Sequence, residues 1–280
     1  MFRNLNELVE AARAKGPVPV AVAAGRDPDA IEALRRAGEL GLAEGIFIED
    51  PDDAAACRKA VALVREGKAR LLMKGKVGTS TLVKAVLDRE TGLRTGGLLS
   101  QVIVFQVPGF DRLMLMSDAA INIAPNLAQK AGICRNAIGV AHAIGMAHPN
   151  VALLCALEYV NPEMPATVDA AALTRMNRGG ELAGGYLEGP VALDVPLSRF
   201  AAERKGISSP IVENTDIFIA PDIEAANILY RAILYFARAE SGGIVVGAKA
   251  PLILLSRAET PETKIRSIAL GILAGGARAG

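Results

Sequence analysis

Four segments of this 280-residue sequence place polar or charged side chains directly after an apolar run, where a strand would end. In the first, the apolar Leu71–Met73 leads into Lys74, Gly75 and a turn that reaches Thr79. Helix-forming residues follow, and a helix N-terminus offers free backbone N–H groups to an anion. Glycine allows close approach of the backbone, and lysine adds a full charge. The spacing is not that of a P-loop, so an anion site and a capped turn with surface lysines both remain open.

The second segment ends an apolar run with Ser117 and Asp118 and then places Asn122 three residues before Pro125. Polar residues at strand ends lie where open α/β sheets bind ligands. The same residue types also favour turns. Taken alone, this segment therefore favours a turn, with substrate binding as the alternative.

The third segment carries Lys249 and then an apolar run that leads directly into Ser256 and Arg257. The planar guanidinium of an arginine can donate two parallel hydrogen bonds to a phosphate. A serine hydroxyl adds a neutral donor. The alternative is a surface ion pair between Arg257 and Glu259 or Glu262.

The fourth segment is a predicted helix that Asp222 caps and that carries Asn227 one turn in. The apolar stripe of this helix predicts that Asn227 lies on its buried face. A buried amide needs a hydrogen-bond partner, which would be either a ligand or a neighbouring loop.

The elements that position these residues alternate between short apolar runs and helix-period segments. This alternation predicts an α/β fold with a mostly parallel sheet covered on both faces. The candidate strands are Pro19–Ala23, Gly45–Ile48, Arg70–Met73, Val102–Phe105, Leu113–Met116, Val151–Cys155, Ile217–Ala220, Ile244–Val246 and Leu252–Leu255. The turn-rich segment Gly179–Pro190 is not among them. We predict a discontinuous first domain, 1–125 with 247–280, and a second domain, 126–246.

Composition excludes several classes of function. The 31 basic and 30 acidic residues give a net charge of +1, and tryptophan is absent, which argues against a nucleic-acid partner. No apolar stretch approaches the roughly 20 residues that cross a bilayer, and the N-terminus lacks the apolar run of a signal peptide. The three cysteines and two histidines form no metal-binding pattern. We expect a cytoplasmic protein with no metal and no membrane partner.

In their order and spacing, six stretches resemble the phosphate acetyl/butyryltransferase family. They are LMKGKVGTST, LMLMSDAAINIAPN, EYVNPEMPATVDAAALTRM, EGPVALDVPLS, TDIFIAPDIEAANILYRA and GGIVVGAKAPLILLSRAE. The resemblance implies two three-layer α/β/α domains with the active site in the cleft between them, and a homo-oligomer of two or more chains. It also implies the reversible reaction acyl-CoA + phosphate to acyl phosphate + CoA without a covalent acyl-enzyme. Coenzyme A is then a substrate, and no cofactor is tightly bound. The third stretch and the Ser-Arg-Ala ending are similar to the butyryltransferase branch, which implies short acyl groups.

Residue by residue, the resemblance assigns Ser256 and Arg257 to the active-site pair that holds phosphate. Where the acetyl branch has an aspartate base the sequence has Thr263. Glu262 is adjacent and Glu259 is nearby, so the base is open between them, and Glu262 is our candidate. The remaining binding candidates are Lys74, Gly75, Thr79, Ser117, Asp118, Asn122, Asn227 and Lys249. Two further departures are Gln101, where the butyryl branch usually has histidine, and Glu213, where the family usually has glycine.

Three other functions remain as alternatives. One is a phosphate acyltransferase that uses acyl-carrier protein instead of coenzyme A. Another is a non-catalytic acyl-CoA-binding module, like the regulatory domain of similar fold at the end of some malic enzymes. The third, a two-domain dehydrogenase, would need metal-binding aspartates and a nicotinamide site, and the sequence shows neither.

Overall fold

The computed structural model describes residues 2–254 and 259–276 of the chain. These residues form two compact units. We call Ser100–Ala239 the central unit, and Phe2–Leu99 together with the described residues from Glu240 onward the terminal unit. Among the described helices, none combines the length and the apolar character that crossing a membrane requires.

The terminal unit is built around five strands in the order β2-β1-β3-β10-β9. Their bounds are β1 (Val18–Ala23), β2 (Ala43–Ile48), β3 (Leu71–Lys74), β9 (Glu240–Val246) and β10 (Leu252–Ile253). Every pair is parallel except β9 with β10. The side chains of β3 up to Met73 and of β10 are buried, as expected for strands that are covered on both faces.

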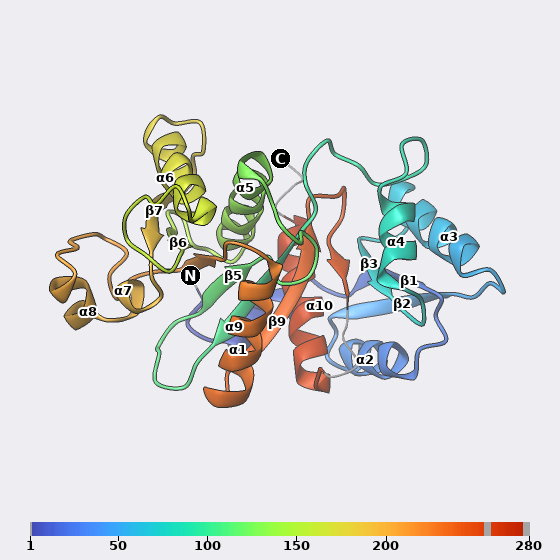
Figure 1. The fold of residues 1–280 in the computed structure, drawn as a ribbon. Coiled ribbons are helices and arrows are strands. Elements are labelled where there is room, and N and C mark those ends of the chain that lie inside the picture. Colours follow the sequence, from blue (N-terminus) through green and yellow to red (C-terminus); the bar gives the residue numbers. More distant parts are fainter. Residues whose placement is uncertain (1, 255–258, 277–280) are drawn as a thin grey trace. The chain divides into compact units, whose positions relative to one another are not determined.

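Five helices cover this sheet: α1 (Leu5–Arg13), α2 (Pro28–Glu39), α3 (Asp53–Arg65), α4 (Thr79–Val86) and α10 (Pro261–Gly276). Helix α3 packs on β1 and on α4, whereas α10 packs on β9, α1 and α2. Figure 1 shows α3 and α4 on one side of the strands and α2 on the other. Asp27 and Asp52 cap α2 and α3 through their side chains, which is why these helices begin where they do.

The central unit has strands in the order β4-β5-β8-β6-β7. They are β4 (Ser100–Gln106), β5 (Met114–Ser117), β6 (Asn150–Leu154), β7 (Tyr186–Val191) and β8 (Ile217–Ile219). The hairpin β4–β5 is antiparallel, and the other pairs are parallel. The predicted α/β fold with mostly parallel strands is therefore confirmed in both units.

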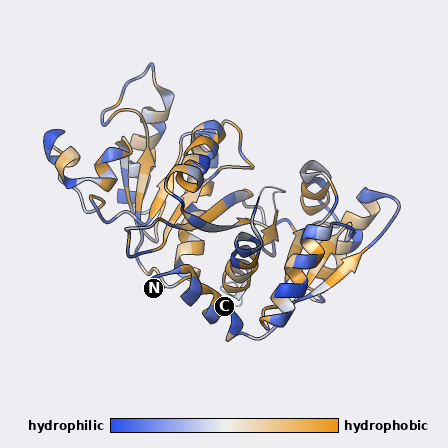
Figure 2. Cartoon of the chain, turned by 90° about the horizontal axis from the view of Figure 1, so that it is seen from below, coloured by the Kyte–Doolittle hydropathy of each residue, from blue (hydrophilic) through white to orange (hydrophobic). Residues whose placement is uncertain are grey.

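Helices lie on both faces of the central strands: α5 (Leu127–Ala143), α6 (Pro165–Arg178), α7 (Asp194–Leu197), α8 (Arg199–Arg204) and α9 (Ile223–Phe236). Helix α5 packs on β4, β5 and β8, and α6 packs on β7. On the other face, Ala226 and Tyr230 of α9 join Met116 and Phe218 in one buried cluster. In Figure 2 the strands are coloured as mostly hydrophobic, and the hydrophilic residues gather on the helices and loops.

Two features differ from the sequence expectations. Strand β7 occupies the end of Gly179–Pro190, which its glycines and proline had marked as turn-rich. It is an edge strand, where proline is tolerated, and Gly189 lets it approach β6, because a Cβ there would lie 2.5 Å from Leu153 Cβ. The compact units also change at Ser100 and Glu240, whereas we predicted crossovers near Pro125 and Gly247. Because β4 pairs with β5, and β5 pairs with β8, both strands belong to the central unit.

Candidate active site

The turn between β3 and α4 is fixed by contact with the loop that follows β1. Gly75 N donates to Ala23 O at 2.9 Å, and Lys76 N donates to Ala24 O at 2.9 Å. A Cβ on Gly75 would lie 2.2 Å from Ala24 O, so only glycine fits there. The predicted role of Gly75, close approach of the backbone, is therefore seen between two loops of the protein itself.

Helix α4 begins at this turn with an uncapped N-terminus. Its first N–H groups lack partners within the helix, and the N-cap Gly78 has no side chain to satisfy them. The first turn contains no acidic residue, and Thr79 is exposed. The partial positive charge of the helix therefore remains available to an anion.

The turn lines a cavity of about 560 Å³, with residues 74–78 forming one wall. The half-buried Lys74 places its Nζ 3.1 Å from Gly75 O and 3.4 Å from Val77 O. These contacts hold a full positive charge at the start of the helix. The assignment of this turn to an anion site stays a prediction, and the position of Lys74 is compatible with it.

Three aspartates also line this cavity, and each already has a hydrogen-bond or ionic partner. Asp27 accepts a hydrogen bond from Asp29 N. The Asp29 carboxylate lies 3.4 Å from Lys264 Nζ, and Asp53 lies 3.3 Å from Arg26 Nη2. None of these three aspartates is among the site residues predicted from the sequence. The one local signal there is the Asp-Pro pair at the start of α2, whose residue types are those of a helix cap.

The remaining candidates of the terminal unit lie outside this cavity lining. Lys249 is exposed in the loop between β9 and β10, where its backbone N–H donates to Leu93 O at 2.8 Å. Ser256 and Arg257 lie outside the described residues. Their assignment to phosphate binding stays a prediction.

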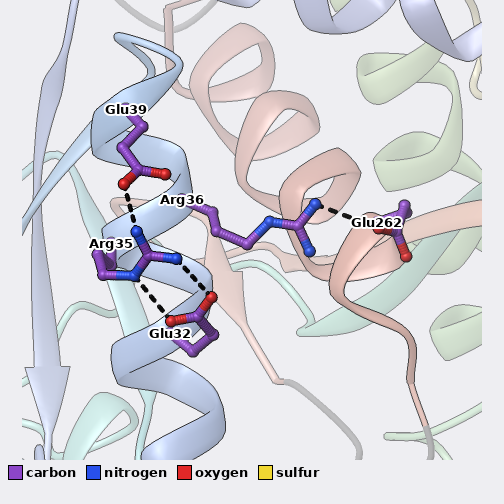
Figure 3. Close-up of polar contacts among 5 residues, drawn as sticks. All are labelled: Glu32, Arg35, Arg36, Glu39 and Glu262. Carbon is purple, nitrogen blue, oxygen red and sulfur yellow. Dashed lines mark hydrogen bonds and ion pairs between the residues drawn. The ribbon is translucent and has the colours of Figure 1, made fainter.

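Glu262 stands in the first turn of α10 and forms an ion pair with α2. Its Oε1 lies 3.2 Å from Arg36 Nη2, and its side chain is 54% exposed. Figure 3 shows Arg36 directed at Glu262, whereas Arg35 turns to Glu32 and Glu39. The pKa of Glu262 is held below its ordinary value, first by a hydrogen bond from its own backbone N–H and then by Arg36. A carboxylate with a lowered pKa is a weaker base, so this geometry gives its predicted catalytic role no support.

In the central unit, Asp118 is a buried residue that organises the turn after β5. Its Oδ1 accepts from the N–H groups of Gln101, Ala120 and Ile121, and its Oδ2 accepts from Asn122 N and Nδ2. The hydroxyl of Ser117 donates to Gln101 O at 2.6 Å. The structure thus brings together three residues that the sequence singled out, and it engages Ser117 and Asp118 with their own chain.

Asn227 does not lie on the buried face of α9, as its stripe had suggested. It is exposed, whereas its neighbour Ala226 and the later Tyr230 are buried. Its Nδ2 donates to Ala119 O at 3.2 Å. The amide therefore holds the turn that follows β5, which was the alternative open from the sequence.

Comparison with known proteins matches residues 52–272 to the family model described as phosphate acetyl/butaryl transferase. This match covers well over half of the chain. The chain belongs to this family. It is 40% identical to the phosphate butyryltransferase of Clostridium acetobutylicum, over 99% of both sequences. It is 41% identical to the phosphate acetyltransferase of Thermotoga maritima, over 95% of this chain and 98% of the relative.

A solved family member has the same fold. The branched-chain phosphotransacylase from Enterococcus faecalis V583 superposes with a TM-score of 0.84 at 32% identity, over 92% of this chain and 99% of that structure. The names of these three relatives cover butyryl, acetyl and branched acyl groups. The names agree on the type of reaction but differ in the acyl group, so family membership does not identify the acyl group of this protein.

Proposed function

We propose that the protein catalyses reversible transfer of an acyl group between coenzyme A and inorganic phosphate. The proposal rests on one observation above the others, the uncapped start of α4 with Lys74 over a cavity, in a chain of this family. Phosphate, acyl phosphate and coenzyme A are all anions. A helix N-terminus joined to a lysine suits a phosphoryl group of any of them.

The proposed mechanism has no covalent acyl-enzyme, and the state of the cysteines supports this. Burial raises the pKa of Cys57 to about 11, that of Cys134 to about 12 and that of Cys155 to about 11. A cysteine nucleophile acts as its thiolate. The raised pKa values therefore disfavour all three thiols as nucleophiles at neutral pH.

In the direction of acyl-CoA formation, the thiolate of coenzyme A attacks the acyl carbonyl and inorganic phosphate leaves. Negative charge develops on the carbonyl oxygen and must meet fixed donors. Ser256 and Arg257 would hold the leaving phosphate, and Lys74 with the turn up to Thr79 would add positive charge. Much of the acceleration would come from holding two substrates in one orientation.

The finer assignments are part of the same proposal. By its resemblance to the butyryl branch, we expect a short acyl group of butyryl type. We also propose a homo-oligomer in the cytoplasm, without a resident cofactor.

The test is release of coenzyme A thiol that depends on phosphate, measured with acetyl-, propionyl-, butyryl- and branched acyl-CoA. We expect turnover with at least one of them, and a preference for the four-carbon chain. The same assay with acyl-carrier protein as the thiol carrier separates the related acyltransferase. Binding of acyl-CoA without turnover of any substrate would overturn the proposal in favour of a regulatory module.

A further inference from the structure

The central unit contains a second cavity, of about 220 Å³, whose lining residues are all apolar. Phe105 and Met114 contribute from the hairpin β4–β5, and Ile233 and Ala237 contribute from the end of α9. Phe110 and Leu193, which are 37% and 36% exposed, also line it. The cavity is therefore open to solvent at one side.

This cavity is separate from the residues predicted to bind substrate. The anion cavity is formed by residues of the terminal unit alone, and this one by residues of the central unit alone. Met116 lines it, and alternation along β5 directs Ser117 to the opposite face of the sheet. A ligand here would leave the hydrogen bond from Ser117 to Gln101 O in place.

Because the wall has no polar side chains, it favours an apolar ligand. An apolar cavity of about 150 Å³ stays dry and binds benzene. The volume here has room for a hydrocarbon chain of about six carbons by the same standard. A polar head group would find no partner inside and would have to stay at the mouth.

A depression beside the cavity supplies a cation for such a head group. The depression shares Phe110 and Leu197 with the cavity and adds Arg112. Arg112 Nη1 donates to Asn214 Oδ1 at 3.3 Å, which leaves further N–H groups of its guanidinium for a carboxylate. Three acids surround it. Glu213 is already paired with Arg199, and Asp111 is exposed. The half-buried Asp216 accepts from Asn150 N at 2.8 Å, and the charge of Arg112 opposes the rise that burial causes in its pKa.

We propose that this cavity binds a short-chain carboxylic acid, with its hydrocarbon tail between α9 and the β4–β5 hairpin and its carboxylate beside Arg112. Transfer of the phosphoryl group of an acyl phosphate to water or to another acceptor, a reaction separate from the proposed one, leaves such an acid. That choice of ligand rests on the proposed function. The prediction that the cavity binds an apolar chain does not rest on the proposed function, because none of the lining residues is among those predicted to bind substrate.

Titration of the full chain with hexanoate and with 1-hexanol, followed by NMR of ¹³C-labelled methionine methyl groups, tests the proposal. We expect saturable shifts at Met114 and Met116 with both ligands. Ala237→Leu fills the cavity and should weaken the binding of both ligands at least about tenfold. Ala232→Leu, on α9 but outside the lining, should leave both affinities unchanged. Arg112→Gln should weaken hexanoate and leave 1-hexanol unchanged.

Saturable shifts with neither ligand would overturn the proposal, as would full affinity in a folded Ala237→Leu variant. An affinity for hexanoate that is the same in Arg112→Gln as in the wild type would overturn the placement of the carboxylate beside Arg112. If Ala237→Leu does not fold, Val107→Thr replaces it, because it keeps the volume and adds a hydroxyl to the wall. Binding of 1-hexanol by a chain that turns over no acyl-CoA would separate this proposal from the proposed function.

Discussion

Arg36 and Glu262 join α2 to the first turn of α10 through an ion pair of 3.2 Å. Glu262 is the second residue of a helix whose start Thr260 stabilises, since Thr263 N donates to Thr260 Oγ1 at 3.2 Å. The residue that the family comparison made a candidate base is therefore part of a helix start and of a contact between helices. This relationship allows the role of Glu262 to be tested.

Replacing Glu262 with Gln should change the free energy of unfolding by less than about 1 kcal/mol, because both partners are exposed. The lowered pKa of Glu262 means that its contribution to stability is present above its ordinary pKa and is lost as the pH falls through the lowered one. If Glu262 is a base, the acid limb of the kcat/KM profile should lie below the ordinary glutamate range. Arg36→Met should then move this limb slightly upward.

The control for that series is Arg35→Met, which breaks the contacts to Glu32 and Glu39 on the same helix but not the pair with Glu262. An acid limb that is identical in the wild type, Glu262→Gln and Arg36→Met would remove Glu262 from the chemistry. We expect the wild type to be slightly more stable than Glu262→Gln above the ordinary glutamate pKa, and the difference to disappear in acid.

Substitution of Gly75 by Ala should destabilise the fold, by about 1–3 kcal/mol or more, because the new methyl group would lie 2.2 Å from Ala24 O. Gly78→Ala is the matched control in the same turn. There the nearest atom is a side-chain oxygen at 3.7 Å, so the stability should hold. Chemical denaturation of both variants measures the difference, and equal midpoints would contradict the close approach.

Lys74→Met should raise the KM for phosphate by about tenfold, because it removes a full charge from the start of α4. The main chain should keep its course, since Gly75 and Lys76 are held by backbone hydrogen bonds. Lys84→Met, in the last turn of the same helix, should leave the KM unchanged. Steady-state kinetics with phosphate as the varied substrate decide the matter, and equal KM values in both variants would exclude Lys74 from the anion site.

Asp118→Asn should lower the free energy of unfolding by about 2–4 kcal/mol. Each carboxylate oxygen of Asp118 accepts hydrogen bonds from backbone N–H groups, and the side-chain NH₂ of an asparagine would face one of these sets of donors instead. The exposed Asp111→Asn serves as the control on the neighbouring hairpin and should be neutral. Urea unfolding followed by circular dichroism reports both. A stable Asp118→Asn with impaired turnover would instead favour a direct role in substrate binding.

Glu213 has a φ of +56°, a left-handed conformation that favours glycine, and glycine is the residue that the family resemblance leads us to expect here. Glu213→Gly should relieve the backbone but lose the hydrogen bonds from Arg199 N and Nε, at 3.0 and 3.1 Å. We expect the two effects to cancel to within about 1 kcal/mol. The substitution Arg199→Ala should then slightly destabilise the wild type. The same substitution made in the Glu213→Gly variant should cause no further loss of stability. A double-mutant cycle without coupling would contradict this account.

The fold was predictable because the apolar runs mark the strands and the caps mark the helices. Strand β7 was not predicted, because its glycine and proline are typical of turns. An edge strand tolerates both residues, but the sequence does not show that β7 lies at an edge. The β3–α4 turn was predictable because all its parts are adjacent in the sequence.

The turn from Asp118 to Asn122 was predictable from its residue types, but the hydrogen bonds of Ser117 and Asp118 to the neighbouring strand were not. Their partner Gln101 is distant in the sequence and meets them only through the pairing of β4 with β5. Asn227 was placed on the wrong face because a helical stripe is wide. The sequence could not show that Ala226 and Tyr230 lie at its centre.

The order β2-β1-β3-β10-β9 also has a consequence for synthesis on the ribosome. Strand β3 needs β10 as its neighbour, and β10 is made only after the whole central unit has emerged. The contiguous central unit can complete its own contacts during translation. The first third of the nascent chain meanwhile carries an unpaired strand edge of the kind that invites aggregation, so the last strands to be translated are the ones that cover it.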